Sequence, residues 1–505
     1  MFKRFITIVI LSLFSLCSLY GENIRIKDIV ITGNKLTKDH IIRREIPFRV
    51  GDIFELKDFN EKVEFAKGNI QNLSLINYVN INWFQTRNLV LHETDSIAAQ
   101  QQDTVLFRRR HDISDVGNQI AAMQQVDGDG PTEVTVIVDV EERWYIWPLI
   151  GIKFEGTNMS NWLRTWNFNQ VTVDVGAIVS NMWGLNHGVS IGGSFGFQKS
   201  AFIKYGNISL DENGKHTIDA NASYSMYKRL NVISVDNVPQ FKFMKDGFIS
   251  QGLDVSAKYT NRPILRLRES LEIAYSRTQI HDSVLILNPN YWGSDSTLRH
   301  TIRLSGDVFY DQRDNARYPL KGYYLEANLQ GTFDLNTNFR MGRISLSGRY
   351  YVPMAKRWFF STEWEGLASI TNREAYIYNL GIGYGKHIIR GYERYTIDGQ
   401  HYLMTNNTFR FCILPKKVVT IKFLSFLPKF NKIHFTIYAK AFLDAGYVWD
   451  FNKNMPNPLA NQFLMSTGLG IDILTYYDIT IGCHAAINIT NWKPQFFFTF
   501  STGIF

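Results

Sequence analysis

The chain has 505 residues, of which 45% are apolar, 14% aromatic and 20% charged, and its net charge is +8. No uninterrupted apolar stretch of about 18 residues follows the N-terminal leader, which excludes a membrane protein built from several transmembrane helices. The basic residues are dispersed along the chain, which argues against nucleic-acid binding. The 36 Phe, 25 Tyr and 11 Trp residues are more than a soluble core usually needs.

The N-terminus has the pattern of a secretory signal peptide. Lys3 and Arg4 form a basic start, and residues 5–16 are almost wholly apolar. About a dozen apolar residues fall short of the ~20 that span a bilayer, so cleavage near Gly21 is favoured over an anchor helix. We therefore expect residues 1–21 to be a signal peptide and the protein to be exported.

Residues 22–142 predict a small α+β module. The predicted elements are a strand at 24–33, a helix that opens at Thr37 and is ended by Pro47, a helix over 57–74, and strands at 78–84 and 133–140. Between the last two strands, residues 86–131 are rich in Gln, Asp, Arg and Gly and show no apolar periodicity. This stretch is predicted to be a solvated insertion within the module.

Residues 143–505 have a different character, because apolar and polar residues alternate repeatedly with a period of two. Ala327 and Leu329 share one face of a predicted strand, for example, and Glu326 and Asn328 share the other. Such strands fit either a soluble sandwich or an outer-membrane β-barrel, in which the apolar face meets lipid and the polar face lines the lumen. Periodicity alone does not separate these two folds.

Three further features favour the membrane barrel. The length of the region suits sixteen antiparallel strands of about ten residues with long outer loops. Aromatic residues cluster where strands are predicted to begin, at 144–147 and 358–360, as in the girdles at a membrane interface. The C-terminal strand carries Phe500 and ends on Phe505 without a polar tail, and such an edge is expected to be paired by closure of the barrel.

Three motifs occur within the predicted barrel. They are the tetrad Ile389-Arg390-Gly391-Tyr392, the strand motif Phe442-Leu443-Asp444-Ala445-Gly446, and a turn signature of Asp311, Arg313, Asp314, Pro319 and Gly322. In this order, after the N-terminal module, they resemble the BamA/TamA superfamily of outer-membrane assembly factors and two-partner-secretion transporters. The resemblance covers essentially the whole mature chain and implies a single POTRA domain followed by a sixteen-stranded transmembrane β-barrel.

The strand motif has a chemistry that can be analysed from the residues themselves. Alternation places Asp444 on the polar face of its strand and Leu443 on the apolar face, so the carboxylate points into the lumen. An arginine folded inside the barrel can bind such a carboxylate with two hydrogen bonds, which lysine cannot reproduce. The resemblance implies that Arg390 makes this contact and locks the sixth outer loop in the lumen, with Gly391 allowing a tight turn. The alternative is that Arg390 is exposed to solvent.

One position departs from the pattern of this superfamily. Members often carry an acidic residue where Thr408 stands, so the lock is expected to be weaker here or to be completed elsewhere. Arg410, two residues further on the same face, is expected to need Asp444 or Glu393 as a partner.

No arrangement typical of an enzyme, a metal site or a cofactor site stands out. Gly381–Gly385 resembles a phosphate-binding loop, but it lies in a strand-like alternating stretch and no helix follows. The histidines do not have the spacing of metal ligands, and no nucleophile elbow of the GxSxG type is present. We therefore predict a protein without catalytic residues, metal or cofactor.

The leading hypothesis is an integral protein of the bacterial outer membrane that inserts or translocates polypeptides. The resemblance implies that the POTRA domain in the periplasm receives an unfolded client, an outer-membrane or secreted protein, and passes it to the barrel seam or lumen. Outer-membrane lipid and periplasmic or lipoprotein partners are expected, and nucleic acid is not. A passive porin-like or structural barrel and a lipid-handling translocon are the alternatives.

Overall fold

The computed structural model describes residues 23–85, 131–154, 171–379, 381–420, 432–451, 457–475 and 479–501. The predicted signal peptide at 1–21, nearly all of the predicted insertion at 86–131, and Phe505 lie outside the described residues. The chain divides into two compact units, one formed by most of the N-terminal module and one that contains the barrel. In the parts of the chain that the structure describes, no α-helix is long and apolar enough to cross a membrane.

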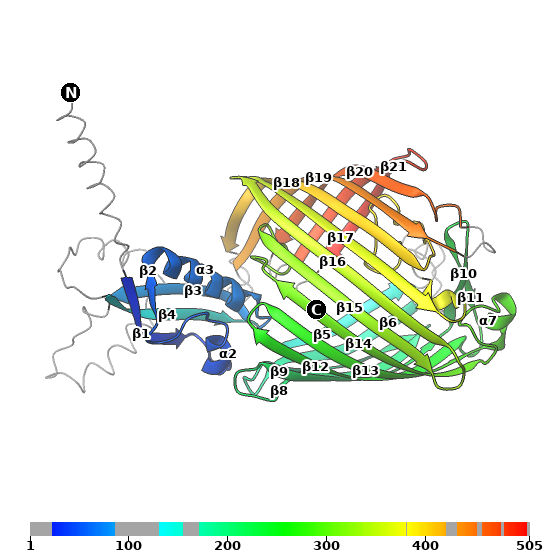
Figure 1. Ribbon diagram of the computed structural model, residues 1–505, viewed down its shortest axis with the longest axis horizontal. Helices are drawn as coiled ribbons and strands as arrows, with labels where there is room; N and C mark the ends of the chain where they lie inside the picture. The colour runs from blue at the N-terminus through cyan, green and yellow to red at the C-terminus, as the bar shows by residue number, and fades with distance from the viewer. Residues whose placement is uncertain are drawn as a thin grey trace, which may run out of the picture. The chain divides into compact units, whose positions relative to one another are not determined.

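The N-terminal module contains a four-stranded sheet. Its elements are β1 (Asn23–Thr32), α2 (Asp39–Arg43), β2 (Ile53–Glu55), α3 (Leu56–Asn72), β3 (Ile76–Gln85) and β4 (Thr132–Glu142) (Figure 1). The strand order is β2-β1-β4-β3, with β1 parallel to β4 and antiparallel to β2. The three strands and the long helix predicted from the sequence are therefore confirmed, and β2 was not predicted.

The first predicted helix is shorter than expected. It begins at Asp39 rather than near Thr37, because Lys38 has an extended backbone and its side chain gives no cap hydrogen bond. It ends at Arg43, well before Pro47, so the proline does not terminate it.

The long helix α3 buries one apolar face, as its spacing of three and four residues predicts. Phe59, Val63, Ala66 and Ile70 are the buried residues of this helix. The strands supply the other half of the core, and alternate valines of β4 are fully buried. The module therefore has a hydrophobic core of its own.

The second unit is built on a sixteen-stranded antiparallel sheet that forms a β-barrel (Figure 1). Its strands are β5 (Ile146–Phe154), β6 (Val171–Met182), β7 (His187–Gly196), β8 (Lys199–Ser209), β9 (His216–Tyr227), β12 (Ser250–Ile264), β13 (Leu267–Ile280), β14 (Leu298–Asp311), β15 (Gly322–Asp334), β16 (Arg340–Ala355), β17 (Trp358–Thr371), β18 (His401–Thr420), β19 (Lys432–Trp449), β20 (Phe463–Thr475), β21 (Ile479–Asn488) and β22 (Gln495–Ser501). Each strand pairs with the next one in the chain, except that β9 pairs with β12. The hairpin between them, β10 (Arg229–Val235) and β11 (Val238–Phe243), forms a separate sheet.

The barrel is apolar on its outer face and polar on its inner face. On β15, Leu329 faces outward and is 65% exposed. The preceding residue, Asn328, faces inward and donates a hydrogen bond of 2.6 Å to Asp307 Oδ1 on β14. Ser270 Oγ on β13 donates to the other oxygen of Asp307. Leucines exposed beside hydrogen-bonded carboxylates are the pattern of a lipid-facing barrel, because only the inner face needs to satisfy polar groups.

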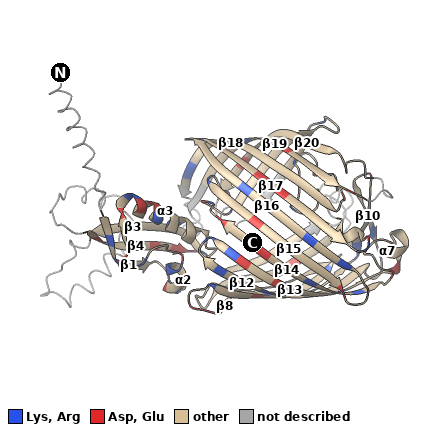
Figure 2. Cartoon of the chain, in the orientation of Figure 1, with Lys and Arg blue, Asp and Glu red and all other residues tan. Residues whose placement is uncertain are grey.

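Aromatic side chains lie at strand ends, as predicted. Trp144 and Trp147 pack together at the start of β5, with ring centroids 5.5 Å apart. Trp358 begins β17 and packs against Phe409 and Phe411 of β18. Charged residues are scattered singly along the barrel strands (Figure 2), so the net positive charge forms no continuous tract there.

The prediction of a strand at Gly381–Gly385 is wrong. The segment belongs to a loop held by two isolated bridges, in which Ile382 pairs with Ile397 and Tyr384 with His387. Gly383 and Gly385 have φ values of +99° and +59°, outside the extended region that regular strand residues occupy.

The turn signature forms a compact connection between β14 and β15. The Arg313 guanidinium holds both carboxylate oxygens of Asp311, at 2.9 and 2.7 Å. Asp314 Oδ1 accepts the backbone N–H groups of Leu320 and Lys321, so the carboxylate closes the turn. Pro319 is buried, and Gly322 begins β15 with φ = +102°.

We predict that Gly322→Ala destabilises the barrel by about 1–3 kcal/mol. A Cβ at this position would lie 2.0 Å from the carbonyl oxygen of Gln312, and the positive φ adds strain. The measurement is urea unfolding of the refolded protein in detergent micelles. Gly342→Ala is the matched control, because its Cβ would meet nothing within 4 Å. Equal stability of the two variants would contradict the assignment of Gly322 as a required glycine.

Candidate functional site

Asp444 lies on the inner face of β19 and is completely buried. Along this strand buried and more exposed residues alternate, so that Leu443 is 46% exposed while the neighbouring Phe442 is 4% exposed. A buried carboxylate without partners would carry a large desolvation cost. Asp444 therefore requires donors within the barrel.

Arg390 supplies those donors from loop 6, the connection of residues 372–400 between β17 and β18. Its Nε and Nη2 atoms donate to Asp444 Oδ2 and Oδ1 at 2.7 and 2.6 Å. The backbone N–H of Arg390 donates to Oδ2 at 3.2 Å, and the N–H of Asn407 donates to Oδ1 at 3.3 Å. This bidentate geometry is the one that the two motifs were expected to form, and it places the loop against the inner wall.

Phe442 adds a second interaction with the same guanidinium. The Cζ atom of Arg390 lies 4.0 Å from the centre of the Phe442 ring, within the range of a cation–π contact. Nη2, which also donates to Asp444, donates to the carbonyl oxygen of Asn407 at 3.3 Å. The arginine side chain is only 17% exposed, so each of these contacts forms in a largely dehydrated site.

Gly391 lets the loop approach the wall closely. It has φ = +93°, and a Cβ would lie 3.2 Å from the Cβ of Ser466 and 3.3 Å from that of Ala486. Asn488 Nδ2 donates to the Gly391 carbonyl at 2.6 Å. Tyr392 follows, 1% exposed, so the loop backbone and its aromatic anchor both lie against β20 and β21.

The strand glycine of the second motif has a matching role. A Cβ on Gly446 would lie 2.5 Å from the Ile389 side chain, so a larger residue would displace the loop. Around this contact, loop 6 and the strands share a buried apolar cluster. It comprises Ile382, Ile389, Tyr392, Ile397, Tyr402, Met404, Val448, Leu459, Ala460 and Leu464.

A second polar contact, between Glu393 and His484, lies beside the first, and the sequence did not predict it. His484 Nε2 is 2.9 Å from Glu393 Oε1, and the other oxygen of Glu393 accepts the backbone N–H of Gly391 at 2.6 Å. His484 also packs edge-on against Phe442, with ring centroids 5.5 Å apart. The signal was available in part, because alternation along β21 puts His484 inside and Cys483 outside.

The expectation for Arg410 is wrong, since it contacts neither Asp444 nor Glu393. Its Nη1 donates to Ser361 Oγ at 2.7 Å, and its guanidinium lies 5.3 Å from the Tyr318 ring centre. Thr408 is buried on the inner face and pairs across the strands with Phe442. The arginine of the loop is thus held by one strand carboxylate, backbone groups and an aromatic ring.

The other predicted residues lie apart from this site. The turn signature at 311–322 is a separate structure, described above. Phe500 belongs to β22 and pairs with Ile481 of β21. Among the described residues, no group of three or more His, Cys, Asp or Glu side chains is arranged to hold a metal ion.

A polar cluster joins the loops near the end of loop 6. Asn237, at the tip of the β10–β11 hairpin, accepts the N–H groups of Thr396 and Leu459 at 2.9 Å each, through its backbone and side-chain oxygens. Asp398 accepts a hydrogen bond from the Tyr384 hydroxyl. Burial, together with the nearby charge of Asp450, raises the pKa of Asp398 to about 6.

Comparison with protein families places this geometry in context. Residues 181–475 match the Omp85 superfamily domain, and residues 24–92 match the POTRA family described as the surface antigen variable number repeat. The chain belongs to the Omp85 superfamily. It is an outer-membrane type of β-barrel with one POTRA region, as the motifs had indicated.

Solved structures similar to this Omp85 chain include two kinds of protein. The crystal structure of BamA from Haemophilus ducreyi lacking POTRA domains 1–3 has 13% identity and a TM-score of 0.49, over 95% of this chain and 84% of that one. CdiB from Acinetobacter baumannii has 12% identity and a TM-score of 0.47, over 94% and 73%. CdiB from Escherichia coli has 14% identity and a TM-score of 0.45, over 96% and 91%. The comparison with curated proteins found no match.

We predict that Arg390→Ala and Asp444→Ala each destabilise the barrel by about 3–5 kcal/mol, because each leaves an unpaired buried charge or acceptor. The double variant is expected to cost about as much as one single variant. Urea unfolding of the four proteins gives the coupling energy directly.

The pair of Arg303 and Glu272 provides the control for this cycle. Its atoms are 3.0 Å apart, but Arg303 is 46% exposed, so its coupling should not exceed about 1 kcal/mol. A double variant of Arg390 and Asp444 that loses the sum of the two single losses would refute a direct pair.

We also predict a pH dependence of the polar loop cluster. Because the pKa of Asp398 is higher in the folded loops than its ordinary value of 3.8, the folded form binds more protons between pH 3.8 and about 6. The contribution of Asp398 to the free energy of unfolding of the loop cluster is therefore most favourable at and below pH 3.8. It is lost as the pH rises to about 6 and does not change further above that pH. The total change in the free energy of unfolding is up to about 3 kcal/mol.

Hydrogen exchange of residues 229–243 and 396–400 measures this effect. Asp398→Asn removes the titration, so the difference in protection between wild type and variant should change across this range. A difference that is the same at pH 4 and pH 7 would contradict the prediction.

Proposed function

We propose that this protein resides in the bacterial outer membrane, with a periplasmic POTRA domain at 22–142 and a barrel at 143–505, and that it inserts or translocates polypeptides. The observation that carries the proposal is the combination of an Omp85 barrel with a POTRA region whose sheet has a long edge strand. A client polypeptide is received by the POTRA domain and passed to the barrel.

The edge strand β3 is the best candidate for receiving the client. The sheet order places β2 and β3 at its two edges, and β3 has ten residues whereas β2 has three. An extended peptide that adds to an edge strand is held by main-chain hydrogen bonds, so its sequence can vary. This supports a client range defined by extended conformation rather than by one sequence.

The interior of the barrel favours transfer along the seam over passive diffusion through an open pore. Loop 6 is anchored to the inner wall by Arg390. The turn between β14 and β15 also reaches other strands, because the hydroxyl of Tyr318 donates to Asp472 on β20 at 3.1 Å and its ring packs on Tyr438 of β19. The sheet order ends at β5 and β22, and we propose the seam between Trp144–Phe154 and Gln495–Phe505.

Unfolded outer-membrane or secreted proteins are the proposed clients, and outer-membrane lipid surrounds the barrel. Periplasmic proteins or lipoproteins are further proposed partners. A passive porin would not need a POTRA module, which is the reason to place that function second. No metal, cofactor or nucleic acid enters the proposed activity.

Depletion of the protein, followed by an inventory of outer-membrane and secreted proteins, tests this function. Loss of many barrel proteins is expected for a general assembly factor, and loss of one secreted protein for a dedicated transporter. An unchanged inventory would contradict both forms of the proposal.

A variant lacking residues 24–142 tests whether the function needs the POTRA domain or only the barrel. We predict that it abolishes rescue of the depleted cells, because the edge strand is gone, while the barrel still folds. Folding is checked by the shift of the unheated barrel on a denaturing gel. Full rescue by a folded variant would favour the passive porin.

A further inference from the structure

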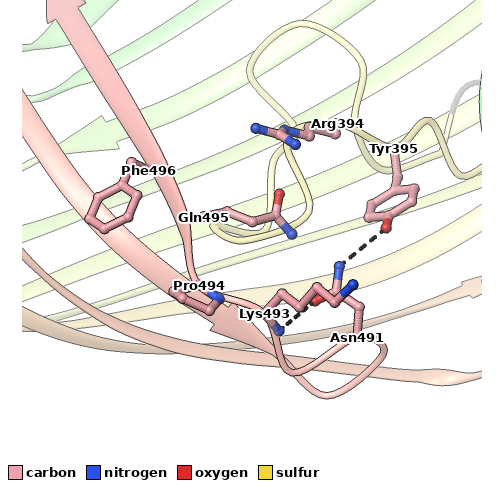
Figure 3. Close-up of a pocket in the computed structure, with 7 residues that line it drawn as sticks. All are labelled: Arg394, Tyr395, Asn491, Lys493, Pro494, Gln495 and Phe496. Carbon is pink, nitrogen blue, oxygen red and sulfur yellow. Dashed lines mark hydrogen bonds between the residues drawn. The ribbon is translucent and has the colours of Figure 1, made fainter.

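A pocket lies where loop 6 meets the beginning of the last barrel strand. It has a volume of about 320 Å³ and adjoins the Arg390 site, although Arg390 itself does not line it. Figure 3 shows its side chains, which come from loop 6, from the β21–β22 connection and from β22. They are Arg394, Tyr395, Asn491, Lys493, Pro494, Gln495 and Phe496.

The charge of this pocket is positive. Arg394 and Lys493 are both exposed, and no acidic residue is among those that line the pocket. Neither side chain forms an ion pair in the described part of the chain, so both remain available to an anion. Two cations from different segments that border one cavity match the charge of a phosphate group.

Gln495 gives the pocket a second feature that points to a ligand, a buried amide oxygen without a hydrogen-bond donor. The residue is only 7% exposed, and its Nε2 lies 3.4 Å from the carbonyl oxygen of Gly391, to which it donates. This bond fixes the orientation of the amide, because a flip would set two acceptors against each other. The amide oxygen is then buried without a partner and faces the side of the pocket that holds Arg394 (Figure 3). A buried acceptor of this kind favours a ligand that brings a donor, such as a hydroxyl group.

The surroundings of the pocket indicate a lipid rather than a soluble ligand. Trp492 and Phe496, one beside the pocket and one in its lining, are 72% and 74% exposed. Large aromatic residues at a strand end are typical of a membrane interface. Because β22 is the sixteenth strand of an antiparallel barrel, its first residue lies at the end of the barrel opposite the start of β5. With the POTRA domain in the periplasm, that end is at the outer leaflet.

We propose that this pocket binds the phosphate-bearing sugar head group of an outer-leaflet glycolipid. Arg394 and Lys493 bind the phosphate, Gln495 Oε1 accepts a hydrogen bond from a sugar hydroxyl, and Trp492 and Phe496 lie at the level of the head groups and acyl chains. The leaflet assignment rests on the proposed function, whereas the binding chemistry does not. The site would hold a glycolipid beside the seam where a client leaves the barrel.

Binding of lipid A to the full chain tests this proposal. The protein is reconstituted in phosphatidylcholine nanodiscs with and without lipid A, and the retained lipid is measured by native mass spectrometry. The double variant Arg394→Gln/Lys493→Gln is expected to lower lipid A affinity by about tenfold or more. Lys242→Gln/Lys245→Gln, which removes the same charge from a different loop, is the matched control and should leave the affinity unchanged.

The variant Gln495→Leu distinguishes recognition of the sugar from recognition of the phosphate. We expect wild type to prefer lipid A to phosphatidic acid, which carries a phosphate without sugar hydroxyls, and the variant to lose that preference. Each variant is first shown to fold by its gel shift. Equal lipid A affinity in wild type and Arg394→Gln/Lys493→Gln would overturn the proposal. Competition by inorganic phosphate or glucosamine 1-phosphate as effective as by lipid A would reassign the pocket to a soluble ligand. Because the assay needs no client, its failure would leave the transport function untouched.

Discussion

The structure depends on one buried charge. Asp444 is fully buried on the inner wall of the barrel, and apart from the backbone N–H of Asn407 its donors come from Arg390 of loop 6. Arg390 does so with the Nε and Nη2 atoms of its guanidinium and with its backbone N–H, and these bonds anchor loop 6 to the inner wall. The cost of dehydrating two charges is recovered only when the pair is well aligned and further hydrogen bonds satisfy its remaining polar atoms.

The close contact between loop 6 and the wall explains the residue types at several neighbouring positions. Gly391 and Gly446 lack side chains where loop and wall meet, and any Cβ there would press on Ser466 or Ile389. Glu393 of loop 6 makes a second polar contact with the wall, through a single bond to His484 of β21. The loop is therefore held by two polar contacts with an apolar cluster behind them, rather than by one isolated ion pair.

The inverted polarity of the barrel explains why the lumen is occupied. Lipid-facing strands expose leucine outward, so their polar residues must find partners inside. Loop 6 supplies partners for β19 and β21, and the β14–β15 turn supplies Tyr318 to Asp472, which also binds Lys440 Nζ at 2.6 Å.

Much of this architecture was predictable from local sequence. A period of two places Asp444 inside and Leu443 outside, and the length of the region suits the sixteen strands that the resemblance implied. Contacts between distant segments were harder to predict from the sequence, because they depend on closure of the whole barrel. Alternation alone puts both Arg410 and Thr408 on the inner face, but it does not show that Arg410 turns to Ser361 and Tyr318. The Glu393–His484 pair joins residues 91 positions apart, and alternation along β21 indicates only that His484 faces inward.

Positive φ values limited prediction in a different way. The alternation at Gly381–Gly385 is that of a strand, yet two glycines there adopt conformations that belong to a loop. Glycine can adopt a positive φ, which lets Gly391 fit against the wall, but apolar-polar periodicity does not show where a glycine does so. Periodicity therefore does not predict the loop conformation of this part of loop 6.

Crosslinking of loop 6 to the wall in living cells tests the central claim most directly. In a background where Cys412 and Cys483 are replaced by serine, Glu393→Cys and His484→Cys are joined by a short thiosulfonate crosslinker. We predict efficient crosslinking when Arg390 is intact and a large loss of crosslinking when Arg390→Ala is added. A crosslink that forms equally well without the Arg390 side chain, or that does not form at all, would contradict the account.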